Sequence, residues 1–293
     1  VKSKEDLGLQ SYRQTLKLQR ENLDEADSKG DTGLEKIIAY LRAVCREDNP
    51  PSAILNEVAA LNPEARSELV AGSRDNAHKL RSFVAVGIED GSITPCDPVL
   101  VALAINGLLS WLPQWFTRQD GRIDLVGEAL TDILIHGLRS HREASSRHTI
   151  PAEISVQKAP REIFDRKAQA RLKREALLKA ATDSFNQKGV SGTSLDAVVK
   201  TLNVTKGTFY YYVSSKDDLL FQCYARSLDL AQDLLNQADA IGANGWEKLE
   251  LAGRAIIDLH CGPNGPIAMF RGVPALSPGR QAGISERVRR DCQ

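Results

Sequence analysis

The sequence predicts an all-α fold. Apolar residues recur at the spacing of an amphipathic helix along most of the chain, whereas runs with the alternating pattern of strands are scarce. A long stretch of sequence also occurs twice, which indicates a duplicated domain. The chain has 293 residues, of which 42% are hydrophobic and 26% charged, enough to bury a sizeable core under a charged surface.

The repeat can be followed residue by residue. Shifting the chain by 212 residues aligns residues 1–43 with 213–255 and gives 18 identities over these 43 positions. After a three-residue insertion the match resumes, and residues 51–74 align with 266–289. Two units of one kind are therefore expected. By this alignment the first copy should lack the segment that precedes residue 213 in the second copy, and the second copy should lack its last two long helices.

The first copy is expected to be helical throughout. Glycine and proline interrupt its apolar pattern at the proposed breaks, and both residues end helices. The predicted helices span residues 4–26, 33–47, 51–61, 64–90, 97–117 and 122–140. The following segment, 141–164, is polar, has no helical spacing and contains Pro151 and Pro160, so it is predicted to be an interdomain linker.

One run without charges lies inside the first copy. Pro98–Phe116 contains nineteen uncharged residues, which is close to the length of a membrane span. Polar residues within it, such as Asn106, favour instead a helix that is buried or lies at an interface. The bulky residues that could line a ligand pocket, form a subunit interface or belong to the core are Trp111, Trp115 and Phe116.

The second copy opens with a basic helix predicted over about 165–188 and ended by Gly189. The residues expected to point inward are Leu172, Leu178, Ala181 and Phe185. A helix of two turns should follow, capped by Thr193 with Asp196 as a capping box. The apolar face of this second helix is expected to consist of Leu195, Val198, Val199 and Leu202.

A tight turn and a short third helix come next. Asn203 suits the left-handed residue of the turn, and Thr205 can cap a helix that runs to about Tyr212. Ser215 with Asp218 can cap the long helix that follows. The second helix, the tight turn and the short third helix together form the helix-turn-helix arrangement that inserts into the major groove of DNA.

The distribution of charge supports this prediction. The formal net charge of the whole chain is zero, which argues against a protein that coats nucleic acid indiscriminately. Residues 161–220 nevertheless contain eleven Lys and Arg against seven acidic residues. The positive excess therefore lies in the segment where DNA would bind.

Three motifs give this segment a specific resemblance. Gly-Thr-Ser-Leu-Asp-Ala-Val-Val at 192–199, Asn-Val-Thr-Lys-Gly-Thr-Phe-Tyr-Tyr-Tyr-Val at 203–213 and Ser-Lys-Asp-Asp-Leu at 215–219 resemble the DNA-binding domain of TetR-type (TetR/AcrR) bacterial transcriptional regulators. The resemblance is strong over about 165–225. Residues 4–140 and 221–293 resemble the ligand-binding and dimerisation domain of the family only in layout. The duplication departs from the family, whose members mostly carry one unit per chain.

The resemblance implies a domain order and a function. It implies a first ligand-binding and dimerisation domain without its helix-turn-helix at 1–140, the linker at 141–164, a helix-turn-helix DNA-binding domain at 165–212 and a partial second ligand-binding domain at 213–293. The implied function is sequence-specific DNA binding in transcription regulation, as a repressor that a small-molecule effector releases. The alternative is a ligand-sensing or protein–protein interaction module whose DNA-binding head is vestigial.

The predicted DNA contacts lie on and around the short third helix. Phe209 and Val213, four residues apart, should face the core. Of the three tyrosines between them, Tyr210 and Tyr211 are expected to face DNA, while the helical period assigns Tyr212 to neither side. Lys206 lies in the first turn, where the helix dipole disfavours a cation unless an anion is near. The residues predicted to contact DNA are Ser194, Thr205, Lys206, Gly207, Thr208, Tyr210, Tyr211 and Lys216.

Other chemistries have no motif in the sequence. The five cysteines are scattered without metal-ligand spacing, and no phosphate-binding glycine loop or nucleophile elbow is present. We therefore expect no metal, no cofactor and no enzymatic activity. The expected partners are double-stranded operator DNA, an unidentified small-molecule effector and either a second copy of the chain or, as an intrachain pseudo-dimer, the other repeat. No membrane partner is expected, and the expected compartment is the bacterial cytoplasm.

Overall fold

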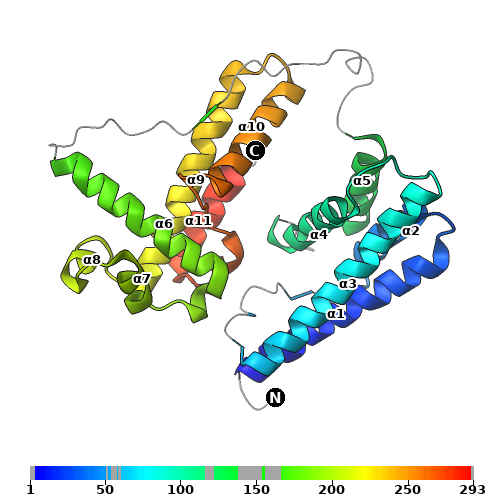
Figure 1. Ribbon diagram of the computed structural model, residues 1–293, viewed down its shortest axis with the longest axis horizontal. Helices are drawn as coiled ribbons and strands as arrows, with labels where there is room; N and C mark the ends of the chain where they lie inside the picture. Colours follow the sequence, from blue (N-terminus) through cyan, green and yellow to red (C-terminus); the bar gives the residue numbers. More distant parts are fainter. Residues whose placement is uncertain are drawn as a thin grey trace. The chain divides into compact units, whose positions relative to one another are not determined.

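The computed structural model shows an all-α protein, as the sequence predicts. It describes residues 4–50, 52–53, 58, 61–115, 122–137, 154–155 and 166–291, and every regular element in these ranges is a helix (Figure 1). The chain divides into two compact units, Val1–Arg139 and Ser140–Gln293, here called unit 1 and unit 2.

In unit 1 the helices predicted over 33–47 and 122–140 end three and four residues early, whereas the helix predicted over 4–26 continues to Lys29. The described helices are α1 (Lys4–Lys29), α2 (Gly33–Val44), α3 (Pro63–Glu89), α4 (Pro98–Trp115) and α5 (Ile123–His136). Helix α2 ends at Val44 because the Asn49 amide donates to the carbonyls of Ala43 and Val44, and α5 ends at His136 because Gly137 takes a positive φ of 70°. The predicted helix at 51–61 lies largely outside the described residues.

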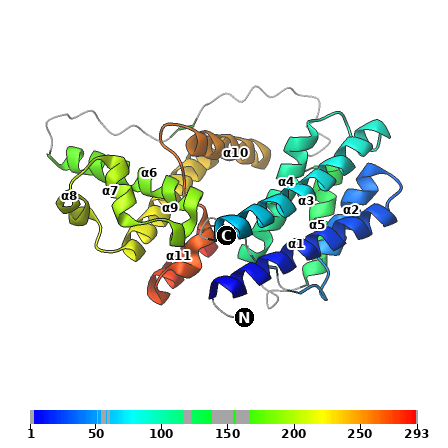
Figure 2. The same cartoon turned by 60° about the horizontal axis from the view of Figure 1, so that its bottom comes forward.

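Two apolar clusters join α1 to α4, a larger core and a smaller cluster of Tyr12, Leu61, Ala65 and Leu69. Helix α2 packs on α1 and α3, and α4 packs on α3 (Figures 1 and 2). The core consists of Leu23, Ala26, Ile37, Tyr40, Leu41, Leu80, Phe83, Val84, Ala102 and Ile105. Helix α4 thus buries one face in protein. No helix in the described ranges is both long and apolar enough to cross a membrane.

The start of α2 lies unusually close to the end of α3. A Cβ atom on Gly33 would lie 2.1 Å from the backbone nitrogen of Gly87, so only glycine fits at this crossing. The loop after α3 also caps α2, because the Gly33 N–H donates to the Asp90 carboxylate (2.8 Å) and the Leu34 N–H donates to the Ser92 hydroxyl (3.1 Å).

The repeat supplies a matched test of this crossing. Gly245 aligns with Gly33 and also begins a helix, but a Cβ atom there would find nothing within 4 Å. We expect Gly33→Ala to lower the free energy of unfolding of unit 1 by about 1–3 kcal/mol through overpacking. Gly245→Ala should change the stability of unit 2 by less than about 1 kcal/mol. Urea unfolding followed by circular dichroism measures both, and equal effects would contradict the assigned crossing.

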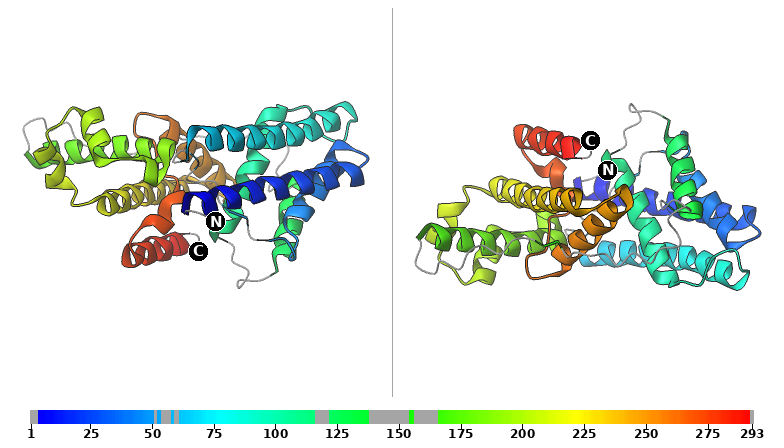
Figure 3. Two further views of the ribbon diagram at one scale, coloured as in Figure 1. Left: turned by 90° about the horizontal axis from the view of Figure 1, so that it is seen from below. Right: turned by 90° about the horizontal axis from the view of Figure 1, so that it is seen from above.

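Unit 2 contains the predicted head and a long helical body. Its described elements are α6 (Arg166–Gly192), α7 (Leu195–Leu202), α8 (Lys206–Tyr212), α9 (Lys216–Ile241), α10 (Gly245–Cys261), the 3₁₀ segment η3 (Phe270–Ala275) and α11 (Pro278–Asp291). Helices α7 and α8 lie beside α6, at the end of the unit remote from α10 (Figures 1 and 2), and α11 runs along α9 (Figure 3).

In helix α6 one residue predicted to be buried is exposed. The helix backbone is interrupted at Gly189, with φ 71° and ψ 175°, where the first helix was predicted to end. Leu178, Ala181 and Phe185 are buried as predicted, but Leu172 is 56% exposed and Leu177 is buried. The prediction for Leu172 is wrong because, at 100° per residue, Leu172 lies on a different side of the helix from Leu178, Ala181 and Phe185.

The two units repeat local structure as well as sequence. Lys36 pairs with Asp27 (2.8 Å) in unit 1, and at the aligned positions Lys248 pairs with Asp239 (2.7 Å) in unit 2. The aligned helices also begin at aligned residues. These starting residues are Lys4 and Lys216, Gly33 and Gly245, and Pro63 and Pro278.

Candidate nucleic-acid interface

The first helix of the candidate interface, α7, is capped one residue later than predicted. The Ser194 hydroxyl accepts from the Ala197 N–H (3.1 Å), so Ser194 and not Thr193 is the N-cap. Thr193 is buried, and its hydroxyl lies 3.0 Å from the Ser184 carbonyl oxygen and 2.9 Å from that of Gly189. The prediction of a Thr193 cap is therefore wrong, because this hydroxyl instead ties α7 to the end of α6.

The turn between α7 and α8 has the predicted backbone. Asn203 adopts the left-handed conformation, with φ 51° and ψ 42°. Its N–H donates to the Lys200 carbonyl, and the Thr205 hydroxyl accepts from the Thr208 N–H (3.2 Å) to begin α8. These local interactions fix α8 against α7 within three residues of chain.

Helix α8 has one buried and one exposed face. Phe209 and, one residue beyond the helix, Val213 are buried in the core of unit 2, as predicted. Tyr210 is 50% exposed and Tyr211 81% exposed. The Tyr211 ring meets the Tyr212 ring edge to face, with centroids 5.0 Å apart, and Tyr212 packs partly against the core. Two phenol side chains with little contribution to the core therefore project from a short helix.

Lys206 has a partner that the sequence reasoning missed. Its ammonium lies 2.7 Å from a carboxylate oxygen of Asp196 on α7, and both side chains are about two-thirds exposed, at 68% and 69%. The Asp196 carboxylate raises the pKa of Lys206. This carboxylate supplies the anion that a cation in the first turn of a helix requires. Because exposed ion pairs contribute little to stability, Lys206 can exchange Asp196 for a phosphate or a base at small cost.

The remaining predicted residues surround this face. Ser194, Thr205, Gly207 and Thr208 are exposed, and Lys216, the first residue of α9, is half-buried. A Cβ atom on Gly207 would find nothing within 4 Å, so packing within the protein does not require glycine there. The space beside Gly207 is open to a partner. DNA contact by each of these residues stays a prediction.

The predicted pocket or interface aromatics belong to unit 1. Trp111 and Trp115 lie in α4, but their side chains, like the whole of Phe116, fall outside the described part of the structure. Near them, α4 and α5 carry exposed apolar residues. These are Val99, Leu100, Leu103, Leu108, Leu125, Ile133, Leu134 and Ile135. In the described ranges, no three or more His, Cys, Asp or Glu side chains are grouped to hold a metal ion.

Comparison with known proteins finds one matching family model in each unit. The family model described as "Tetracyclin repressor-like, C-terminal domain" matches residues 34–138, and the model "Bacterial regulatory proteins, tetR family" matches residues 177–223. The second match contains α7 and α8 and therefore the exposed tyrosine face.

Curated relatives match a limited part of the chain. The Transposon Tn10 TetC protein of Escherichia coli is 32% identical over 76 residues, 26% of this chain and 38% of TetC. The HTH-type transcriptional regulator AcrR of Shigella flexneri is 36% identical over 61 residues, 21% of this chain and 28% of AcrR. The Biofilm operon icaADBC HTH-type negative transcriptional regulator IcaR of Staphylococcus aureus (strain Newman) is 30% identical over 71 residues, 24% of this chain and 36% of IcaR.

These matches span about a third of the length of each relative. The family's C-terminal domain here precedes its N-terminal helix-turn-helix, as expected for two units in tandem. The chain belongs to the TetR family of bacterial regulatory proteins.

Proposed function

We propose that the chain is a sequence-specific DNA-binding transcriptional regulator of the bacterial cytoplasm, with α8 as its recognition helix. The observation that carries the proposal is the two-faced α8. Its Phe209 side anchors it in the core, while Tyr210 and Tyr211 project outward from a short helix held by a tight turn. This arrangement presents side chains to the edges of bases in a major groove.

The exposed groups around α8 suit two kinds of contact. The Ser194 hydroxyl uses its oxygen to accept from Ala197, which leaves its proton free for a phosphate oxygen. Lys206 and the Tyr210 phenol can reach base edges, and the tyrosine rings can contact thymine methyl groups. The open side of Gly207 lets the helix approach the DNA closely.

Selection from a library of random duplexes tests this proposal. A sequence-specific protein enriches a motif, since each correct base pair contributes about 1–3 kcal/mol. We expect enrichment of a defined motif over successive rounds. A protein that binds the library but enriches no motif would not be a sequence-specific regulator.

Repression and effector control are supported by the family and by the relative IcaR, which is a negative transcriptional regulator. A small molecule bound in a C-terminal domain would act on DNA affinity by favouring one of two conformations. The exposed apolar residues of α4 and α5 further support pairing of such domains. Pairing would occur between two chains or between the two units of one chain, and light scattering distinguishes these two arrangements by mass.

Lys216 is proposed to contact phosphate rather than bases, because it lies at the start of α9 and not on the exposed face of α8. We expect Lys216→Ala to weaken binding to all duplexes alike and to lower the slope of log affinity against log salt by about one. Fluorescence anisotropy at a series of salt concentrations measures this slope. An unchanged slope, or a loss confined to one duplex sequence, would remove Lys216 from the phosphate contacts.

A further inference from the structure

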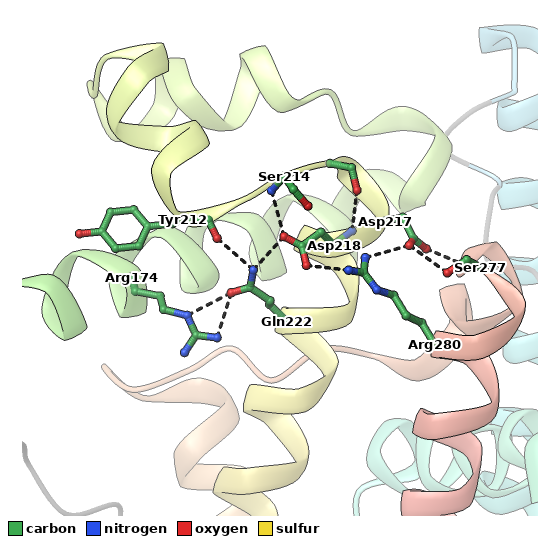
Figure 4. A network of polar contacts seen from close by, with 9 residues as sticks. Arg174, Tyr212, Ser214, Asp217, Asp218, Gln222, Ser277 and Arg280 are labelled. Carbon is green, nitrogen blue, oxygen red and sulfur yellow. Dashed lines mark hydrogen bonds and ion pairs between the residues drawn. The ribbon is translucent and has the colours of Figure 1, made fainter.

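A polar network links α11 to the beginning of α9 (Figure 4). The Arg280 guanidinium donates to Asp217 (2.8 Å) and to Asp218 (2.9 Å), so one side chain bridges two carboxylates. Asp217 also accepts from the Ser277 N–H (2.8 Å) and from the Ser277 hydroxyl (3.0 Å). These bonds fasten the first turn of α11 to the first turn of α9.

The same network continues to the end of α8. The second oxygen of Asp218 accepts from the Ser214 N–H (2.9 Å) and from the Gln222 side-chain amide (3.1 Å). The Gln222 amide also donates to the Tyr212 carbonyl (3.0 Å), the last residue of α8. Its oxygen accepts from Arg174 on α6 (3.0 and 2.9 Å). Arg280 is therefore separated from the last residue of α8 by two side chains, Asp218 and Gln222.

The position of Arg280 is not explained by the stability of α11 alone. The helix dipole disfavours a cation in the first turn of a helix, and the first turn of α11 contains no acidic residue to offset the charge of Arg280. The two carboxylates on α9 stabilise this charge instead. The guanidinium also lies over the Phe221 ring, 5.3 Å from the centroid, which further fixes its orientation.

The repeat shows that the arginine is specific to one unit. Unit 1 keeps Asp6 and Gln10 at the positions of Asp218 and Gln222, but it has Ala65 at the position of Arg280. Helix α3 of unit 1 therefore cannot make this bridge. Of the two aligned positions, the one with an arginine belongs to unit 2, which also contains the helix-turn-helix.

We propose that Arg280 is a positioning residue for DNA recognition: through Asp218 and Gln222 it sets how firmly the end of α8 is held by the body of unit 2. A shift of α11 then changes how rigidly α8 is held, and with it the affinity for DNA, without any contact between α11 and DNA. The inference rests on the proposed function, since it assigns to α11 a control over the same recognition helix.

The test compares two arginines of α11. Arg280→Ala removes the bridge, whereas Arg287→Ala removes an ion pair between the same two helices, to Asp229 (2.6 Å), that is remote from α8. We expect Arg280→Ala to speed hydrogen–deuterium exchange over residues 205–216 about fivefold and to weaken binding to the selected duplex about fivefold, the scale of one charge-assisted bridge. Arg287→Ala should change neither the exchange rate nor the duplex affinity. Arg280→Lys should restore only part of both, because a lysine ammonium cannot span both carboxylates as the planar guanidinium does.

Each outcome is decisive. Equal exchange over 205–216 in both alanine variants would overturn the coupling, and faster exchange with unchanged duplex affinity would overturn its role in DNA binding. A wild-type protein that prefers no duplex would refute the proposed function, while the exchange data would still decide the coupling. If Arg280→Ala lowers the melting temperature of the whole unit, Asp217→Asn, which weakens the same bridge from α9, replaces it in both measurements.

Discussion

Phe209→Ala should lower the free energy of unfolding of unit 2 by about 3–5 kcal/mol, the usual cost of removing a buried phenylalanine ring from a core. The Phe209 side chain is fully buried in the main core cluster of unit 2, where it holds α8 against α6, α7 and α9. Because α8 is only seven residues long, its own backbone hydrogen bonds cannot keep it folded without this anchor. Urea unfolding followed by circular dichroism measures the loss.

Tyr211→Ala is the matched control, because it removes an aromatic ring from the same helix. Tyr211 is 81% exposed, so its removal should change stability by less than about 0.5 kcal/mol. Similar losses for the two variants would mean that α8 is not oriented as described. They would also remove the basis for assigning Tyr210 and Tyr211 to DNA.

Replacing both Lys206 and Tyr210 with alanine should weaken binding to the selected duplex roughly a hundredfold, since each base contact contributes about 1–3 kcal/mol. Thermal stability should stay nearly unchanged, because the ion pair of Lys206 is exposed and Tyr210 is half exposed. Fluorescence anisotropy at one salt concentration and a thermal melt measure the two quantities.

Asp196→Ala separates DNA contact from a role within the protein. It removes the partner of Lys206 but leaves the lysine in place. If Lys206 acts on DNA, Asp196→Ala should bind the duplex at least as tightly as the wild type, because a negative charge next to the phosphates is lost. If Lys206 served only to join α7 and α8, Asp196→Ala would weaken binding as much as Lys206→Ala does.

Much of the head could be predicted from sequence because its signals are local. Asn203 in the turn, the Thr205 cap and the Ser215 cap with Asp218 all depend on residues within four positions, and the structure confirms them. The buried Phe209 likewise follows from the period of the helix.

The errors and omissions have a common physical cause. Whether Thr193 or the neighbouring Ser194 caps α7 depends on a hydrogen bond to Ser184, nine residues away, and a hydroxyl at either position fits the local pattern. The pair of Lys206 with Asp196 and the bridge from Arg280 likewise join separate helices. Such contacts depend on how helices pack, which local spacing does not specify.

Methylation interference tests most directly whether α8 reads DNA from the major groove. Methyl groups on guanine N7 project into the major groove, whereas those on adenine N3 project into the minor groove. The selected duplex, methylated at either position, is divided into bound and free fractions by the wild-type protein. We predict that guanine N7 methylation within the motif blocks binding and adenine N3 methylation does not. Interference from adenine N3 alone, or from neither position, would contradict recognition by α8.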